Sequence, residues 1–326
     1  MVLRSFARRL AYKLPPTRRI LLARDAALAE RDALRRASGR GQLPFLLQRR
    51  GRPLLVQEPP DFEAPDSQLV SEAQILSPRF EQWRQAFRMR PGLNRKLWEY
   101  LYIAQALDHY VGLRDGVRVL GFGVGRERIP AVLAARGCSV TATDFAAAGE
   151  WAAQSLDDML RPKDSDTDPA LADQPICEAE LFRRLVSFRD VDMNAIPADL
   201  RDYDALWSCG SLEHIGGLQQ GLDFIERSLD CLKPGGIAVH TTEFNLSSDA
   251  VTMDTPGMSF YRRSDILALA ARLTAQGHSM VLNLTRSTGP IDQHVDKPPY
   301  DYALTMNALV GGYLITSIGL IIQKSQ

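Results

Sequence analysis

The chain of 326 residues has few cysteines and lacks a hydrophobic run long enough to cross a membrane. Its four cysteines lie 39, 32 and 22 residues apart, which is neither a zinc pattern nor a disulfide framework and fits a reducing compartment. The longest apolar run, residues 313–322, is about half of the roughly 18–20 residues that a membrane-spanning helix needs. The sequence therefore predicts neither an integral membrane protein nor a disulfide-rich domain, and we expect a cytoplasmic protein.

Charge of one sign does not dominate the whole chain, because 39 Lys and Arg residues balance 39 Asp and Glu residues. Residues 1–52 are nevertheless basic, with 14 Lys and Arg against 3 Asp and Glu. From Leu3 onward, apolar residues fall at helical spacing among arginines, so we expect residues 1–39 to form a basic helical arm. Three roles for the arm stay open: a solvated extension, a peripheral contact of residues 1–36 with the inner membrane surface, and an organelle-targeting presequence.

Proline and hydrophobic patterns divide the remainder into a linker and one large domain. Six prolines within residues 40–79 predict a linker without regular elements of any length. An apolar stripe over residues 80–111 predicts a helical region that a Pro-Gly pair interrupts once. We therefore place a domain at residues 80–326, with its core at residues 112–326.

From residue 117 onward, short β-rich runs alternate with helical patterns, which is typical of a parallel sheet covered by helices. The predicted strands span residues 117–121, 139–143, 186–190, 204–208 and 237–242. The predicted helices span residues 127–136, 146–160, 218–232 and 264–276. A final pair of strands, at residues 280–285 and 312–323, has no helix between its members, and we expect their connection to be loop-like.

The sharpest motif is a glycine loop, Gly121-Phe122-Gly123-Val124-Gly125, between a predicted strand and a predicted helix. Glycines there let the backbone turn tightly and let a ligand approach the amide groups. A dinucleotide fingerprint places a third glycine where this sequence has Arg126. A ligand without a pyrophosphate therefore suits the loop better, and a purely structural role for the glycines stays open.

Acidic residues follow the next two predicted strands. Asp144 lies 19 residues after Gly125, where a carboxylate can accept hydrogen bonds from both hydroxyls of a ribose. A helix N-cap is the alternative role for Asp144. Asp192 follows the third strand, where it can accept from an adenine amino group while the Met193 amide donates to the ring. A turn-forming role is the alternative for Asp192, and Asp190 competes for the assignment.

One further motif directly follows the fourth predicted strand, and another directly precedes the fifth. The run from Ser208 through Gly210 and Glu213 to His214 stands at the carboxyl end of the fourth strand, the edge at which open α/β sheets bind ligands. The Lys-Pro-Gly-Gly run at residues 233–236 predicts a type II turn with an architectural role.

In this order, the five motifs resemble those of the class I S-adenosylmethionine-dependent methyltransferases, over about residues 93–326. Residues 240–245 and 311–313 look like those of uncharacterised bacterial members. The resemblance implies an α/β fold with a Rossmann-like, doubly wound seven-stranded sheet, mostly parallel with an antiparallel terminal strand pair. It also implies S-adenosyl-L-methionine as the cofactor. The cofactor-binding residues that it implies are Gly121, Phe122, Gly123, Gly125, Asp144, Asp192, Met193 and Ser208.

Methyl transfer is an in-line displacement, so the enzyme mainly has to align the nucleophile and exclude water. A hydroxyl acceptor would also need a general base. Our first candidate for the base is His214, which Glu213 would orient unless Glu213 caps the next helix. His240 and Glu243, at the end of the fifth strand, are the second candidates. A packing role for His214 without proton transfer is the alternative.

We expect O-methylation of a small molecule or of a glycan intermediate, the latter because the basic arm looks like those of enzymes of bacterial surface-glycan assembly. A nicotinamide-dependent oxidoreductase is disfavoured by Arg126 and by the terminal strand pair. A non-catalytic S-adenosylmethionine-binding scaffold stays open. A nucleic-acid methyltransferase is disfavoured because the fourth motif lacks the Asn/Asp-Pro-Pro-aromatic signature. We expect no metal, because Gly210 replaces a glutamate ligand of a related quinone-pathway group.

Overall fold

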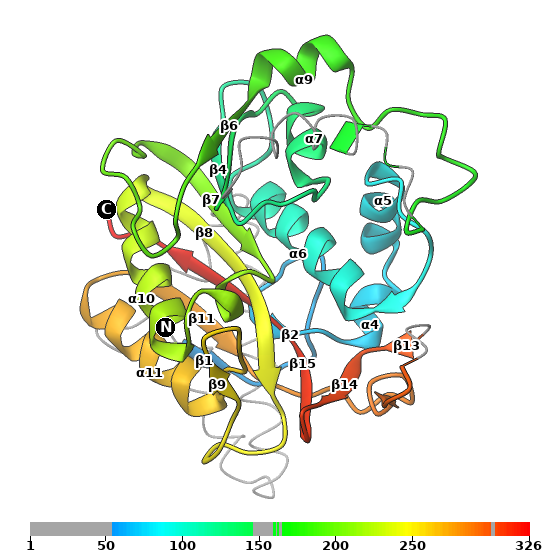
Figure 1. Ribbon diagram of the computed structural model, residues 1–326, viewed down its shortest axis with the longest axis vertical. Helices are drawn as coiled ribbons and strands as arrows, with labels where there is room; N and C mark the ends of the chain where they lie inside the picture. The colour runs from blue at the N-terminus through cyan, green and yellow to red at the C-terminus, as the bar shows by residue number, and fades with distance from the viewer. Residues whose placement is uncertain (1–53, 146–158, 161, 163–164, 301–303) are drawn as a thin grey trace, which may run out of the picture.

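The computed structural model describes residues 54–145, 159–160, 162, 165–300 and 304–326. Within them, a central sheet carries helices on both faces (Figure 1). The predicted basic arm, with its membrane-contact residues 1–36, lies outside the described residues, and so does the predicted helix 146–160 apart from its last two residues. No helix of the described chain is both long and apolar enough to span a membrane.

Five parallel strands form the half of the sheet that the alternating sequence pattern predicts. Their spatial order is β6 (Val186–Asp190), β5 (Ser139–Asp144), β4 (Arg118–Phe122), β7 (Tyr203–Cys209) and β8 (Leu232–Asn245). Val119 of β4 pairs with Val140 of β5 on one side and with Ala205 of β7 on the other. The strand order therefore reverses between β4 and β7, and such a reversal opens a crevice at the carboxyl ends of the strands.

β15 (Tyr313–Gln323) is the antiparallel strand of the sheet. It pairs with β8 over nine residue pairs, beginning with Ile315 opposite Asn245. β11 (Ser279–Asn283) runs antiparallel beside the end of β15. These strands confirm the predicted fold class, a Rossmann-like doubly wound sheet that is mostly parallel and has an antiparallel terminal pair.

The connection between β11 and β15, expected to be loop-like, contains three short strands. They are β12 (Val295–Asp296), β13 (Leu304–Thr305) and β14 (Asn307–Val310). β14 forms a hairpin with β15 through Gly311 and Gly312, whose φ angles of 56° and 85° lie in the left-handed region that glycine adopts without strain. The sequence pattern misses these strands because runs of two to four residues show no period.

Residues 54–79, predicted to be part of a linker, instead join the sheet. β1 (Leu54–Val56) pairs with β11, and β2 (Ser67–Leu69) inserts between β11 and β15. The Ser67 hydroxyl accepts a hydrogen bond from the Ile321 amide (2.8 Å) and lies 3.2 Å from the Ile321 carbonyl oxygen. The linker prediction is wrong here because strands of three residues fit between the prolines. Within the described residues, the sheet accordingly has eleven strands rather than seven.

The main helices cover both faces of the sheet. α5 (Pro78–Ala86), α6 (Arg95–Tyr110) and α7 (Ile129–Ala134) lie on one face, and α10 (Leu218–Ser228) and α11 (Arg263–Ala275) lie on the other (Figure 1). The break between α5 and α6 confirms the predicted interruption. Asn94 caps α6 by accepting a hydrogen bond from the Lys96 amide (2.7 Å), so the first turn of α6 is fixed beneath the carboxyl ends of the strands.

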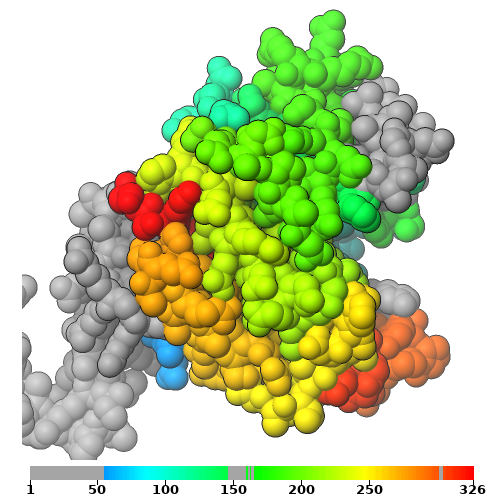
Figure 2. All heavy atoms as spheres, turned by 60° about the vertical axis from the view of Figure 1, so that its left-hand side comes forward, coloured from blue at the N-terminus to red at the C-terminus, as the bar shows by residue number. Residues whose placement is uncertain are grey.

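Several short elements complete the fold. They are α4 (Glu72–Ile75), β3 (Leu93–Asn94), α9 (Ala179–Leu185), the 3-10 turns η1 (Leu212–His214) and η2 (Leu229–Cys231), β9 (Asp254–Thr255) and β10 (Met258–Ser259). Figure 2 shows the face covered by α10 and α11, the latter in orange. An ion pair of 2.7 Å between Arg272 and Glu226 joins these two helices. The 3-10 turn η1, which precedes α10, borders the crevice at the carboxyl ends of the strands.

Candidate functional site

A cavity of about 530 Å³ lies at the carboxyl ends of β4, β5, β6 and β7, where the strand order reverses. This volume is typical of a site for a small organic ligand. Its walls come from the glycine loop, the ends of β5 and β6, the segment after β7 and the β9–β10 turn. The lining residues are Gly123, Asp144, Phe145, Asp192, Met193, Asn194, Gly210, Ser211, His214, Ile215, Gly216 and Pro256. Four of the five sequence motifs therefore contribute residues to this cavity.

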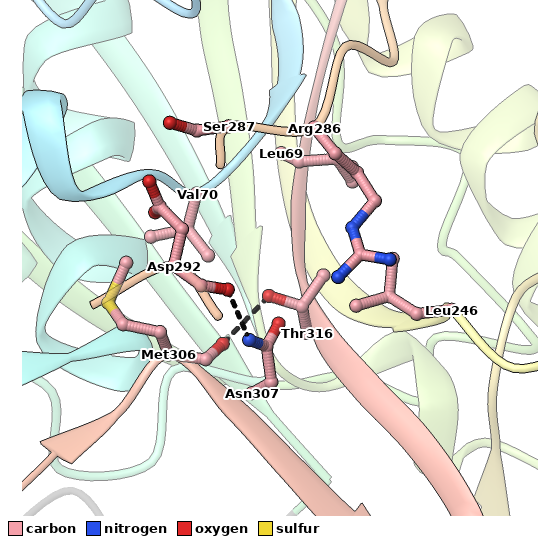
Figure 3. A pocket seen from close by; sticks show the side chains of 9 residues that line it. All are labelled: Leu69, Val70, Leu246, Arg286, Ser287, Asp292, Met306, Asn307 and Thr316. Atoms are coloured by element: carbon pink, nitrogen blue, oxygen red, sulfur yellow. Dashed lines mark hydrogen bonds between the residues drawn. The ribbon is translucent and has the colours of Figure 1, made fainter. Parts of the chain in front are cut away.

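A second, much smaller cavity lies beside β2 and β15, and Figure 3 shows the side chains around it. The Asn307 amide donates to the Asp292 carbonyl (2.7 Å), and the Thr316 hydroxyl donates to the Met306 carbonyl (2.8 Å). The free volume is about 20 Å³, which is room for about one water molecule. This cavity is too small for an organic ligand, whereas the larger one lies where the sequence motifs meet and is therefore the candidate site.

The glycines of the loop have different roles. Gly123 lines the large cavity with a φ of 61°, and a Cβ there would lie 2.5 Å from the Ser211 Oγ. Gly121 does not line the cavity, and a Cβ there would overlap the ring of Trp207. Phe122 packs in the core, with its ring edge-on to Phe224 at 5.2 Å. Gly121 and Phe122 therefore shape the loop, whereas Gly123 exposes the backbone to a ligand.

Asp144 ends β5 and joins it to the glycine loop. One carboxylate oxygen accepts a hydrogen bond from the Gly125 amide (2.7 Å), and the other accepts from the Phe145 amide (2.8 Å). The Val124 amide donates to the Thr143 carbonyl (3.0 Å) and fixes the loop to the same strand. Each carboxylate oxygen has a further lone pair. Asp144 can thus hold the loop closed and still accept from a ligand in the cavity.

Asp192 lines the cavity and also forms a turn. Its carboxylate accepts a hydrogen bond from the Asn194 amide (2.7 Å), and its carbonyl accepts from the Ala195 amide (2.9 Å). Met193 lines the cavity as well, with its side chain buried toward the glycine loop. Asp190, at the end of β6, is exposed and does not line the cavity. The two roles proposed for Asp192 are therefore compatible, and Asp190 does not compete.

His214 lies at the end of η1 and lines the cavity with an exposed side chain. Its Nδ1 lies 2.8 Å from the Gly257 carbonyl oxygen. Because a carbonyl only accepts, Nδ1 carries the proton of this hydrogen bond, and Nε2 is the ring nitrogen left for another partner. Glu213 hydrogen-bonds with Thr242 instead (2.9 Å). The expectation that Glu213 orients His214 is therefore wrong, because the Gly257 carbonyl holds the ring.

Ser208 and His240 lie in the core rather than at the cavity, which corrects two of our predictions. Both are fully buried, on neighbouring strands, and the Ser208 hydroxyl lies 2.8 Å from Nδ1 of His240. The His240 ring also lies edge-on to Phe224 at 5.7 Å. Burial lowers the pKa of His240 to about 3, so the ring is neutral. Neither side chain reaches a ligand in the cavity.

Glu213 and Glu243 belong to a cluster of charged side chains beneath the cavity. Its other members are Glu99, Arg95 and Lys96, all from the first turns of α6. We call these five residues the buried charge cluster, of which the Lys96 side chain alone is partly exposed, at 44%. Sequence reasoning missed the three α6 residues, although three charges within five residues of a predicted apolar helix are a visible signal.

Ion pairs determine the protonation states within the buried charge cluster. Burial acts to raise the pKa of Glu243, but the cations Lys96 (2.9 Å) and Arg95 (2.7 Å) outweigh it and lower that pKa. Glu213 has no such close partner, since its Oε1 lies 3.9 Å from the Lys96 ammonium. Burial therefore raises the pKa of Glu213 to about 7. Glu243 is a fixed anion that faces its cations rather than the cavity.

No protein-family model matches the sequence, and no curated protein matches it. Similar solved structures include YjhP from E. coli (19% identity over 47% of this chain and 52% of that chain, TM-score 0.33). Another is the 1,6-didemethyltoxoflavin-N1-methyltransferase of Burkholderia thailandensis with bound 1,6-didemethyltoxoflavin and S-adenosylhomocysteine (16% identity over 78% of this chain and 87% of that chain, TM-score 0.41). A third is the CcbJ methyltransferase of Streptomyces caelestis (13% identity over 71% of this chain and 94% of that chain, TM-score 0.39). The match to YjhP spans about half of that protein.

Proposed function

We propose that this protein is a methyltransferase that binds S-adenosyl-L-methionine in the large cavity and methylates a small molecule or a glycan intermediate. The ribose hydroxyls would bond to Asp144, the adenine would lie against Asp192 and Met193, and the backbone at Gly123 would face the methionine part. The residues fit the cofactor because Gly123 lines the cavity with backbone alone and the carboxylates of Asp144 and Asp192 line the same cavity.

The charge of the side chains that line the cavity is the main support for this proposal. Among the described residues that line it, the ionisable side chains are Asp144, Asp192 and His214, and none is Lys or Arg. S-adenosylmethionine brings a sulfonium and an ammonium group, which two carboxylates attract. A dinucleotide brings a pyrophosphate, which would meet the same carboxylates with no cation to offset them. The lining therefore favours the sulfonium cofactor over a nicotinamide cofactor.

The chain's own contribution to methyl transfer is alignment and, for a hydroxyl acceptor, proton removal. The cofactor would supply an activated methyl group whose leaving group departs as a neutral thioether. His214 faces the cavity with Nε2 available as a proton acceptor, and the Gly257 carbonyl fixes the orientation of its ring. A positioned base of this kind contributes roughly 10²–10⁴-fold to the rate. This geometry favours O-methylation by an active enzyme over a non-catalytic binding protein.

The setting of the enzyme is also part of the proposal. We place it in the cytoplasm, with residues 1–36 contacting an anionic membrane surface through their basic side chains. The catalytic domain would comprise residues 80–326 together with the strands at residues 54–79 that join its sheet. We do not expect nucleic acid to be the acceptor, because the cavity lining is acidic.

Calorimetric titration of the full chain tests the proposed cofactor. We expect S-adenosylmethionine and S-adenosylhomocysteine each to bind with micromolar affinity, and NADH to give no heat of binding. Micromolar binding of the first two would then justify screening sugars, glycan intermediates and small hydroxylated molecules as acceptors. Heat from NADH alone, or from none of the three ligands, would contradict the proposal.

A further inference from the structure

The buried charge cluster contains more negative than positive charge. Its carboxylates are Glu99, Glu213 and Glu243, and its cations are Arg95 and Lys96. The cluster therefore carries an excess of one negative charge whenever all three carboxylates are ionised. Unpaired charge is rare in a protein interior because its desolvation is costly, so its position calls for a reason.

The excess charge is located on Glu213. Lys96 contacts Glu99 at 3.0 Å and Glu243 at 2.9 Å, and Arg95 contacts Glu243 at 2.7 Å, so these two carboxylates share the cations. Glu213 is fully buried, and its Oε1 accepts no hydrogen bond.

The other carboxylate oxygen of Glu213 fixes the direction of the group. Oε2 accepts a hydrogen bond from the Thr242 hydroxyl at 2.9 Å. A Cβ at Gly210 would lie 3.5 Å from Glu213 Oε1, so the unpartnered oxygen faces Gly210. The same Cβ would lie 3.2 Å from the Lys96 ammonium and 3.2 Å from Glu99 Oε2.

Gly210 is the wall shared by the cluster and the cavity. It lines the cavity, and its φ of 55° is in the left-handed region, which disfavours other residues. Gly210 contributes only backbone to this wall, and Glu213 Oε1 lies on its cluster side, 3.5 Å from where a Cβ would stand. A charge beneath a thin wall of low dielectric acts strongly across it.

The remaining titratable groups near Gly210 do not offset this charge. Burial raises the pKa of the Cys209 thiol and of the Tyr100 hydroxyl, so both are neutral near pH 8, and it also raises the pKa of the Glu127 carboxyl. His214, on the cavity side of the wall, donates from Nδ1 to the Gly257 carbonyl. Lys96 and Glu99 lie equally near Gly210 and pair with each other, so the excess negative charge at this end of the cavity is that of Glu213 above the pH at which it ionises.

We propose that the Glu213 carboxylate, acting through the gap at Gly210, recognises the positive sulfonium centre of S-adenosylmethionine and so favours it over the neutral thioether product. The inference rests on the proposed function. With ribose at Asp144, adenine at Asp192 and the methionine part at Gly123, we place the sulfur beside Gly210, which lines the same cavity. During transfer, the sulfur–methyl bond breaks with its electron pair staying on sulfur, while the acceptor forms the new bond to the methyl carbon. The positive charge disappears, and the attraction to Glu213 disappears with it.

The test compares two ligands that differ in this charge. Calorimetry at pH 8 measures the affinities for S-adenosylmethionine and for S-adenosylhomocysteine in the wild type and in Glu213→Gln, which keeps the shape and removes the charge. We expect Glu213→Gln to weaken S-adenosylmethionine binding about tenfold while S-adenosylhomocysteine binding changes less than about twofold. Glu226→Gln, which neutralises a carboxylate on α10 outside the cavity, is the matched control and should change neither affinity.

Equal weakening of both ligands, or of neither, would show that Glu213 has a structural role only. The wild type gives a second measurement that needs no folded variant. Lowering the pH from 8 to 6 protonates Glu213, so the preference for S-adenosylmethionine should fall, and a constant preference contradicts the inference. Absence of S-adenosylhomocysteine binding in the wild type would instead overturn the proposed function, so the two failures are distinguishable.

Discussion

The neutral, buried state of His240 makes the stability of the protein depend on pH in a way that can be calculated. In the unfolded chain the ring titrates near pH 6.5, whereas burial lowers its pKa in the folded protein to about 3. Between these values the unfolded state binds more protons than the folded state. The stability that comes from a neutral His240 is therefore present above pH 6.5 and is lost as the pH falls toward 3.

The size of the effect follows from the two pKa values. Each pKa unit corresponds to about 1.4 kcal/mol, so the full loss is about 5 kcal/mol, of which about 2 kcal/mol is lost between pH 8 and pH 5. Urea denaturation at both pH values measures it as a change in the free energy of unfolding. His240→Asn keeps a polar group beside Ser208 but does not titrate, so the variant should lose about 2 kcal/mol less than the wild type.

His294, whose side chain is exposed on a loop, provides the matched control. His294→Asn should lose as much stability on acidification as the wild type does. Acidification that destabilises His240→Asn as strongly as the wild type would refute the reasoning. It would mean that the pKa of His240 is similar in the folded and the unfolded protein. The ring would then be a candidate for acid–base chemistry.

Three further predictions concern the site. Asp144→Asn should weaken S-adenosylhomocysteine binding by about tenfold or more through the loss of charge-assisted hydrogen bonds to ribose, whereas Asp190→Asn, outside the cavity, should bind normally. Gly121→Ala should lower the free energy of unfolding by about 1–3 kcal/mol in urea denaturation, because the new methyl group overlaps Trp207, and an unchanged midpoint would contradict this packing. His214→Gln should keep cofactor affinity in calorimetry but lower the rate of methyl transfer to a hydroxyl acceptor roughly 10²-fold, and an unchanged rate would leave His214 a packing role.

Local motifs made much of the parallel sheet and the cavity predictable. Gly123, Asp144 and Asp192 each follow a β-rich run, and the carboxyl ends of parallel strands meet at one edge of a sheet. Pairing β4 between β5 and β7 then brings these three residues to a common cavity. Order along the chain was sufficient because each residue sits at the end of its strand or within two residues after it.

The misassigned residues depend on facts that local sequence does not contain. Ser208 and His240 lie on central strands that are buried on both faces, so alternation gives no sign of which side chains point away from the ligand. Arg95 meets Glu243 across 148 residues of sequence, and no local pattern predicts such a contact. β2 joins the sheet through partners more than 200 residues away, which proline spacing does not reveal.

A crystal structure of the protein with S-adenosylhomocysteine would test the central proposal most directly. We predict electron density for the ligand in the large cavity, with its ribose hydroxyls on Asp144, its adenine beside Asp192 and its sulfur next to Gly210. Density for the ligand at another surface, or a reversed ligand with adenine at Gly210, would contradict our account of the site.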